Sequence, residues 1–267
     1  MNYSRITSSS NPKIKEAIDI SRRKSRTEHA SFIIEGPHLI EMALAADTSI
    51  SEVFFTEAFG RKEEGQRTLR QLSKCTARIY EVAEHLLVKL SETEAPQGII
   101  AVATHSLLPL SELQLRDNPL LAVSDGIRDP GNLGTIIRTA DAAGADGVVI
   151  LPGTCDVYMQ KVIRATAGSL FNIPVAHAAV DELLDWLQAH KIKLAITVAD
   201  AAKPLFGAEL DKPVAFVFGN EAQGVQEDLK EAADMVLSIP IYGRAESLNV
   251  AASAAICLYE AVRQRRR

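Results

Sequence analysis

The chain has 267 residues, of which 47% are hydrophobic and 24% are charged, a composition typical of a globular protein with one large or two small domains. The apolar runs are too short to cross a bilayer and the first residues form no apolar signal segment, so we expect a cytosolic protein. Three widely spaced cysteines without a CxxC pair argue against a disulfide framework and against a cysteine zinc site.

The net charge is −5, but basic residues gather near both ends of the chain. Four arginines lie among the last five residues, and the N-terminal group comprises Lys13, Lys15, Arg22, Arg23, Lys24 and Arg26. Such clusters attract phosphate groups even on an acidic protein. A solvated helix face and a frayed tail would show the same pattern, so charge alone leaves both interpretations open.

Residues 31–104 alternate short apolar runs with charged, helix-like stretches, which predicts a small α/β unit. A stretch with prolines and polar residues follows it and is typical of a linker. We therefore predict a first domain at 1–106, a linker at 107–118 and a second domain at 119–267.

The second half alternates helices with strands that are continuous apolar runs. Predicted strands cover 120–125, 147–153, 193–198, 214–219 and 235–240, and predicted helices cover 132–144, 157–167 and the C-terminal segment. Runs of this kind indicate a largely parallel sheet with helices on both faces. Because ligands of such sheets bind beyond the carboxyl ends of the strands, we expect the chemistry in the loops after Asp125, Phe218 and Pro240.

The sequence lacks the motifs of several common sites. It contains no GxGxxG dinucleotide-binding motif after the first strand of this half, no GxxxxGK[ST] phosphate-binding loop, no GxSxG nucleophile motif and no HExxH zinc motif. The six histidines are scattered, and none lies four residues from another. We therefore expect neither a metal centre nor a serine–histidine triad, and assign single histidines such as His177 to surface or core positions.

The first of the three loops leads into a predicted helix. Asn132 stands where a helix N-cap would be, and Gly144 suits the position just past the helix C-terminus. Arg138 lies within the helix, three residues before Asp141, so an ordinary surface ion pair between them is one interpretation.

The other two loops also combine glycine with polar side chains. Gly219 ends a buried strand and allows close backbone approach, and Glu221 follows it, although a carboxylate near a helix N-terminus is stabilising in any βα turn. Ser247 and Asn249 precede an alanine-rich helix, where they can serve simply as cap residues.

Taken together, NLGTIIRTADAAG, FVFGNEAQGV and IPIYGRAESLNVAASAA resemble the three signature motifs of the SpoU/TrmH branch of the SPOUT methyltransferases, in the same order. The N-terminal segments ITSSSNPKIKEAIDISRRKSRTEHASFIIEGPHLIEMAL and SETEAPQGIIAV resemble the substrate-binding domain that precedes this catalytic domain. The resemblance covers almost the whole chain.

The resemblance implies an α/β sheet domain with a C-terminal trefoil knot, S-adenosylmethionine bound in the knot without a metal, and a homodimer. It also implies methyl transfer to a ribose 2'-hydroxyl, in ribosomal RNA in preference to transfer RNA. By position, Asn132, Arg138, Glu221, Ser247 and Asn249 match the functional polar residues. Gly219, Ile239 and Leu248 match cofactor-binding positions, and we expect Val198, Asn220 and Pro240 to complete the cofactor site.

Arg138 is the residue we expect to act on the hydroxyl. A guanidinium rarely loses its proton, so positioning the ribose and stabilising developing alkoxide charge is a more conservative role than that of general base. Ser247 or Asn132 would orient the Arg138 side chain. The segment 11–26 is the predicted RNA contact.

Two alternatives remain from the sequence. The same chemistry could act on transfer RNA, or the scaffold could serve as a catalytically silent RNA-binding or ribosome-assembly factor. An unrelated dinucleotide enzyme is disfavoured because its phosphate-binding glycine loop is missing.

Overall fold

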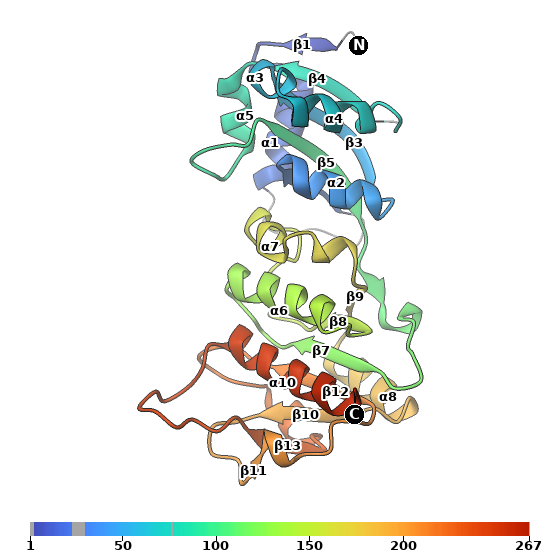
Figure 1. The fold of residues 1–267 in the computed structure, drawn as a ribbon, viewed down its shortest axis with the longest axis vertical. Coiled ribbons are helices and arrows are strands. Elements are labelled where there is room, and N and C mark those ends of the chain that lie inside the picture. Colours follow the sequence, from blue (N-terminus) through green and yellow to red (C-terminus); the bar gives the residue numbers. More distant parts are fainter. Residues whose placement is uncertain (1–2, 23–29, 76, 267) are drawn as a thin grey trace. The chain divides into compact units, whose positions relative to one another are not determined.

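The computed structural model describes residues 3–22, 30–75 and 77–266, and its contacts divide the chain into two compact units (Figure 1). The first unit comprises Met1–Ser106 and Asp156–Phe171, and the second comprises Leu107–Cys155 and Asn172–Arg267. No helix in the described ranges is long and apolar enough to cross a membrane.

The first unit contains a five-stranded mixed sheet in the order β1-β4-β3-β5-β2. Its strands are β1 (Ser4–Ile6), β2 (Ala30–Glu35), β3 (Ser49–Thr56), β4 (Arg78–Val82) and β5 (Ile99–His105). Its helices are α1 (Pro12–Arg22), α2 (Pro37–Ala45), α3 (Glu57–Gly60), α4 (Glu63–Leu72), α5 (Glu84–Leu90) and α7 (Gln160–Thr166), with a 3₁₀ turn at Ser169–Phe171. Apolar side chains of α1 and α5 pack on the sheet around Phe54, which confirms the predicted small α/β unit.

The helix α7 comes from the second half of the sequence but belongs to the first unit. The ring of Tyr158 stacks on Phe32 of β2 with centroids 4.6 Å apart, and Gln160 Nε2 donates to the carbonyl of Leu90 at 3.2 Å. The predicted helix at 157–167 is therefore present in shorter form, but its packing partners are residues more than sixty positions earlier in the chain.

The second unit is built on an eight-stranded, all-parallel sheet in the order β11-β13-β10-β12-β7-β8-β9-β6. Its strands are β6 (Leu108–Pro109), β7 (Leu120–Ser124), β8 (Gly147–Ile150), β9 (Val175–His177), β10 (Lys193–Thr197), β11 (Lys203–Pro204), β12 (Val214–Phe218) and β13 (Met235–Ser238). Its helices are α6 (Pro130–Ala142), α8 (Val180–Ala189), α9 (Glu227–Glu231) and α10 (Val250–Arg265), with 3₁₀ turns at Leu110–Glu112 and Leu205–Gly207.

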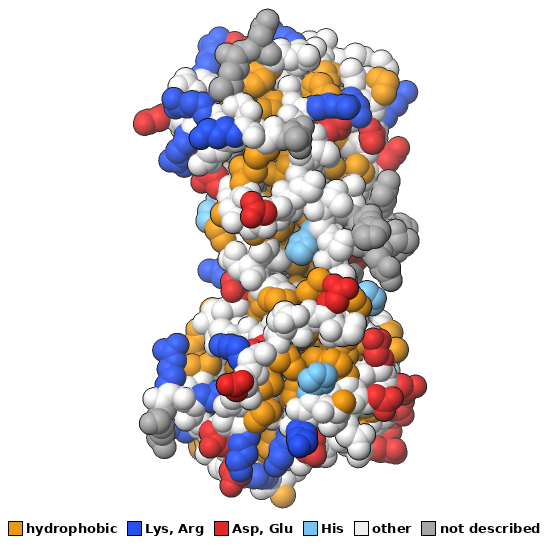
Figure 2. Space-filling view, turned by 90° about the vertical axis from the view of Figure 1, so that its right-hand side faces the viewer, with side chains coloured by type: hydrophobic (Ala, Val, Ile, Leu, Met, Phe, Trp, Pro, Cys, Tyr) orange, Lys and Arg blue, Asp and Glu red, His pale blue; other side chains and the backbone are white. Residues whose placement is uncertain are grey.

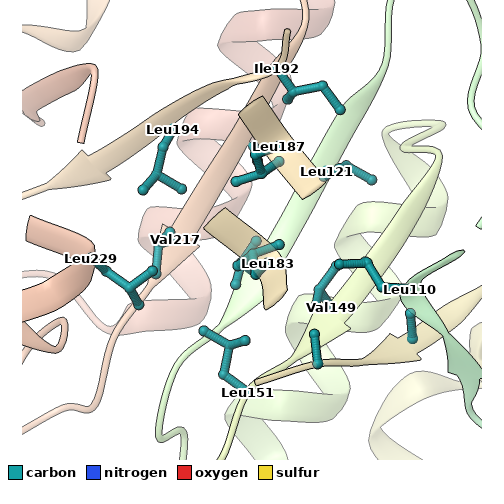
Figure 3. Close-up of a cluster of buried hydrophobic side chains, with 14 of the residues drawn as sticks. Leu110, Leu121, Val149, Leu151, Leu183, Leu187, Ile192, Leu194, Val217 and Leu229 are labelled. Carbon is teal, nitrogen blue, oxygen red and sulfur yellow. The ribbon is translucent and has the colours of Figure 1, made fainter. Parts of the chain in front are cut away.

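Helices cover both faces of this sheet, as the continuous apolar strands predict. On one face Leu183 and Leu187 of α8 and Leu229 of α9 meet strand residues such as Leu121 and Val217 (Figure 3). On the other face α6 and α10 lie side by side against β7 and β12 (Figure 1). The carboxyl ends of the central strands and the loops that follow them are therefore framed by helices.

Residues 107–118, expected as a linker, are instead part of the second unit. β6 pairs with β9, and Leu110 and Leu113 are buried in the core. The Asp146 carboxylate, 1% exposed, accepts hydrogen bonds from Arg116 Nε at 2.8 Å and from the amide of Leu120 at 2.8 Å. The polar composition is that of a linker, but apolar residues at spaced positions and the ion pair between exposed Arg116 and the buried Asp146 carboxylate anchor the segment to the domain.

Candidate active site

Three loops at the carboxyl ends of β7, β12 and β13 converge in the second unit. Asn132 Nδ2 donates to Glu221 Oε1 at 2.7 Å, and Asn249 Nδ2 donates to Asn132 Oδ1 at 3.0 Å. These bonds join residues that are 89 and 117 positions apart in sequence. The structure therefore joins three of the predicted catalytic residues, Glu221, Asn132 and Asn249, by two successive hydrogen bonds.

Asn132 is free to make these bonds because it is not the helix cap, which corrects the prediction. The N-cap of α6 is Asp129, whose side chain accepts from the Asn132 amide at 2.9 Å, and Pro130 occupies the first helical position. Proline is pre-organised for that first position, so it sets the start of the helix one residue after Asp129. Gly144 has a φ of 65° just past the end of α6, as expected.

Asn249 is the N-cap of α10, as the sequence indicates. Its Oδ1 accepts from the amides of Ala251 at 2.9 Å and Ala252 at 3.2 Å, while its Nδ2 holds Asn132. The Asn249 side chain therefore caps α10 through its oxygen and binds Asn132 through its nitrogen. The expected interpretation as a simple cap is correct but incomplete.

The turn after β12 explains both Gly219 and Asn220. A Cβ on Gly219 would lie 2.4 Å from the backbone of Gly224 and Val225, so no larger residue fits there. Asn220 Oδ1 accepts from the amides of Ala222 and Gln223, and its Nδ2 donates to the carbonyl of Gly126 at 2.8 Å. The close approach at Gly219 therefore serves the turn that presents Glu221.

A cleft of about 630 Å³ opens beside this turn. It is lined by the predicted residues Val198, Gly219, Asn220, Glu221, Ile239, Ser247, Leu248 and Asn249, together with residues the sequence did not single out, among them Thr197, Phe218, Ile241 and Ser253. Pro240 stands between two lining residues without lining the cleft itself. The cleft thus has apolar walls and a polar end marked by Glu221 and Asn249.

Arg138 lies outside this cleft. Its side chain is exposed on α6, about 9 Å along the helix axis from Asn132 at the usual rise per residue. It makes no hydrogen bond or ion pair with any residue the structure describes, so the surface pair with Asp141 does not form. The expected association of Arg138 with the other site residues is not found within a single chain.

The predicted RNA contact is described only in part, because Arg23, Lys24 and Arg26 fall outside the described residues. Lys15 and Arg22 are exposed on α1. Lys13 instead pairs with the buried Glu52 at 2.7 Å and with Glu16 at 3.0 Å, and these hydrogen bonds raise the pKa of Lys13. Lysine and arginine side chains are spread with acidic ones over one face of this unit (Figure 2).

Comparisons with known proteins place the chain in a family. Residues 119–259 match the SpoU rRNA Methylase family, and residues 11–101 match an MRM3-like substrate binding domain. The 23S rRNA (guanosine(2553)-2'-O)-methyltransferase RlmP of Bacillus subtilis is 36% identical over 95% of this chain and 97% of its own length. The chain therefore belongs to the SpoU rRNA methylase family.

Solved structures agree in both units. The crystal structure of an RNA 2'-O ribose methyltransferase has a TM-score of 0.85 and 39% identity, and covers 98% of this chain and 100% of its own. An AdoMet-bound rRNA methyltransferase from Sinorhizobium meliloti has a TM-score of 0.87 and 31% identity, with 98% of each chain covered. The predicted α/β fold and the family resemblance are confirmed.

Proposed function

We propose that this protein transfers a methyl group from S-adenosylmethionine to a ribose 2'-hydroxyl of 23S-type ribosomal RNA in the cytoplasm. The observation that carries the proposal is the Glu221–Asn132–Asn249 chain at the polar end of the cleft. Its three members come from the three loops that resemble the family motifs. Two of the proteins named above, RlmP and the methyltransferase from Sinorhizobium meliloti, are rRNA methyltransferases, which favours ribosomal RNA over transfer RNA.

The cleft fits the proposed cofactor in size and chemistry. A volume of about 630 Å³ lies in the range of small-molecule pockets, and apolar side chains with a few polar groups are the usual lining for a nucleoside. Val198, Ile239 and Leu248 would flank the adenine, and the glycine-bearing turn offers backbone groups. When bound, the sulfonium supplies an already activated methyl group.

The protein's own task is then to place the hydroxyl. Ser247 and Asn249 at the polar end can hold the ribose by hydrogen bonds, and Glu221 fixes the amide of Asn132 so that its loop keeps one position. Arg138 would stabilise negative charge developing on the ribose oxygen. We assign no proton abstraction to Arg138: as the O–C bond forms and the S–C bond of the sulfonium breaks, the hydroxyl proton passes to water.

A homodimer would explain where Arg138 acts. Tyr259 of α10 is 49% exposed, and its Oη donates to the carbonyl of Ala142 at the end of α6. A second copy docking on α10 and α6 would cover Tyr259 and meet the helix that carries Arg138. We therefore place Arg138 at the cleft of the second copy.

We further propose that the chain is threaded as a trefoil knot. After β13, near one edge of the sheet, the loop 239–249 extends away and the chain returns as α10 to pack against α6, β7 and β12 (Figure 1). Such a return, from the strand next to the edge of the sheet back to its central strands, supports threading.

The first unit would bind RNA, with the exposed Lys15 and Arg22 in a salt-sensitive contact.

The test measures transfer of tritium from labelled S-adenosylmethionine to ribosomal RNA from a strain that lacks the gene, followed by mapping of the methylated ribose. Arg138→Ala should lower turnover by about two orders of magnitude or more, while calorimetry finds unchanged cofactor affinity. Lys212→Ala, which removes an exposed cation before β12, is the matched control. RNA binding without any transfer by the unaltered protein would instead support the silent-factor alternative, and normal turnover of Arg138→Ala would remove Arg138 from the site.

A further inference from the structure

A second cavity of about 510 Å³ lies on the other side of the turn that walls the cleft. Asn220, Gln223, Gly224, Val225 and Lys230 line both cavities, so a single backbone turn separates them. The remaining walls come from the loops after β7 and β8 and from the start of α9. A group bound there would lie within a few ångströms of the cleft wall.

Bare backbone forms one side of this cavity. Gly126 and Gly153 have φ values of 65° and 84°, a region that other residues rarely adopt. A Cβ on Gly153 would lie 3.6 Å from the Cα of Gly126, so the two glycines face each other closely. Because neither glycine carries a side chain, a planar or bulky ligand can approach the peptide groups at these two positions directly.

The charges around the cavity leave one cation available. The Asp125 carboxylate is 1% exposed and accepts from the amide of Gln226 at 2.8 Å and from the Gln226 side chain. Lys230 pairs with Glu227 at 3.0 Å. Arg128 is exposed and has no hydrogen bond or ion pair to any other described residue, so its guanidinium is the charge a ligand would meet.

We propose that this cavity binds the RNA nucleotide next to the one whose ribose is methylated, with Arg128 on its phosphate. The proposal rests on the proposed function. The target ribose must approach Glu221 at the cleft, and Asn220 and Gln223, on either side of Glu221, also line the second cavity, so the next nucleotide of the strand can reach it. The volume lies in the range of small-molecule pockets, and the planar guanidinium fork matches a phosphate in two hydrogen bonds.

The experiment titrates the full-length protein with ribosomal RNA fragments that contain the mapped site, at several salt concentrations. Arg128→Ala should weaken RNA binding by about tenfold and reduce the slope of log affinity against log salt by about one. Arg128→Lys should restore the slope but only part of the affinity, because an ammonium lacks the fork. Cofactor affinity, measured by calorimetry, should stay within about twofold of the unaltered protein.

Lys193→Ala is the matched control, since Lys193 is an exposed cation at the first residue of β10, the end of the strand opposite the cavity. Unchanged RNA affinity and salt slope in Arg128→Ala would overturn the proposal, as would an equal loss in the control. A loss of cofactor affinity would also overturn it. Failure of the proposed function is distinguishable, because it would show as absent methyl transfer by the unaltered protein whatever Arg128 contributes to binding.

Discussion

The hydrogen bond between Asn132 and Glu221 can be tested by reversing its direction. Asn132→Asp replaces the amide that lies 2.7 Å from Glu221 Oε1 with a second carboxylate of nearly the same shape. Two charges at that separation repel by between about 1.5 kcal/mol at the dielectric constant of water and about 6 kcal/mol at an effective value of about 20. Because Glu221 is exposed and Asn132 is only half-buried, we expect the lower part of this range.

A cost of about 2 kcal/mol corresponds to roughly thirtyfold in an equilibrium constant. The repulsion separates the loops that carry Asn132 and Glu221, and Glu221 lines the cleft, so Asn132→Asp should weaken binding of S-adenosylmethionine by about that factor. Glu221→Gln alone should have a small effect, because its amide oxygen still accepts from Asn132.

The double variant should recover most of the affinity, to within about threefold of the unaltered protein. In it the introduced glutamine amide donates to the introduced carboxylate, which also still accepts from Asn249 Nδ2. Isothermal calorimetry on all four proteins gives the coupling energy directly. Asn172→Asp, at an exposed turn, controls for added charge. A double variant that binds no better than Asn132→Asp would refute the reasoning.

Two further predictions concern stability and assembly. Burial by itself would raise the pKa of Asp146, but hydrogen bonds from the Arg116 guanidinium and from backbone amides outweigh burial and lower that pKa. This carboxylate therefore stabilises the fold fully above its unfolded pKa of about 3.9. The contribution is lost as the pH falls through the lower pKa of the folded state. Asp146→Asn should therefore lower the free energy of unfolding at neutral pH by about 2 kcal/mol, measured in urea, and should differ less from the unaltered protein in acid. Asp117→Asn, at an exposed carboxylate, should change little, and parallel pH profiles of Asp146→Asn and the unaltered protein would contradict the prediction. Mixing inactive Arg138→Ala and Glu221→Ala subunits should restore about a quarter of the sites if each cleft takes Arg138 from the other copy, and a mixture that stays inactive after subunit exchange would show that it does not.

Local chemistry made much of the second unit predictable. Continuous apolar runs indicate strands buried on both faces, and the structure has strands within all five predicted ranges. Gly144 and Asn249 end and begin helices for reasons that lie within a few residues of each. The resemblance of the three loops supplied the family before any contact was known.

Other features could not be seen in the sequence because they depend on partners far along the chain. Lys13 looks like a free cation until Glu52 is placed beside it, and residues 107–118 look like a linker until β9 and Asp146 hold them. The residue that caps α6 was misjudged by three positions, because Asp129 and Asn132 are both good caps and only the observed helix start separates them.

The sequence by itself determined the family, the parallel sheet and the identity of the polar residues in the three loops. Only the tertiary structure decided which of them meet: Asn132 lies between Glu221 and Asn249, whereas Arg138 is exposed and does not line the cleft of its own chain. The physical reason is that hydrogen bonds and cavities form between segments about a hundred residues apart, and the relative placement of such segments is set by how the sheet and its helices pack.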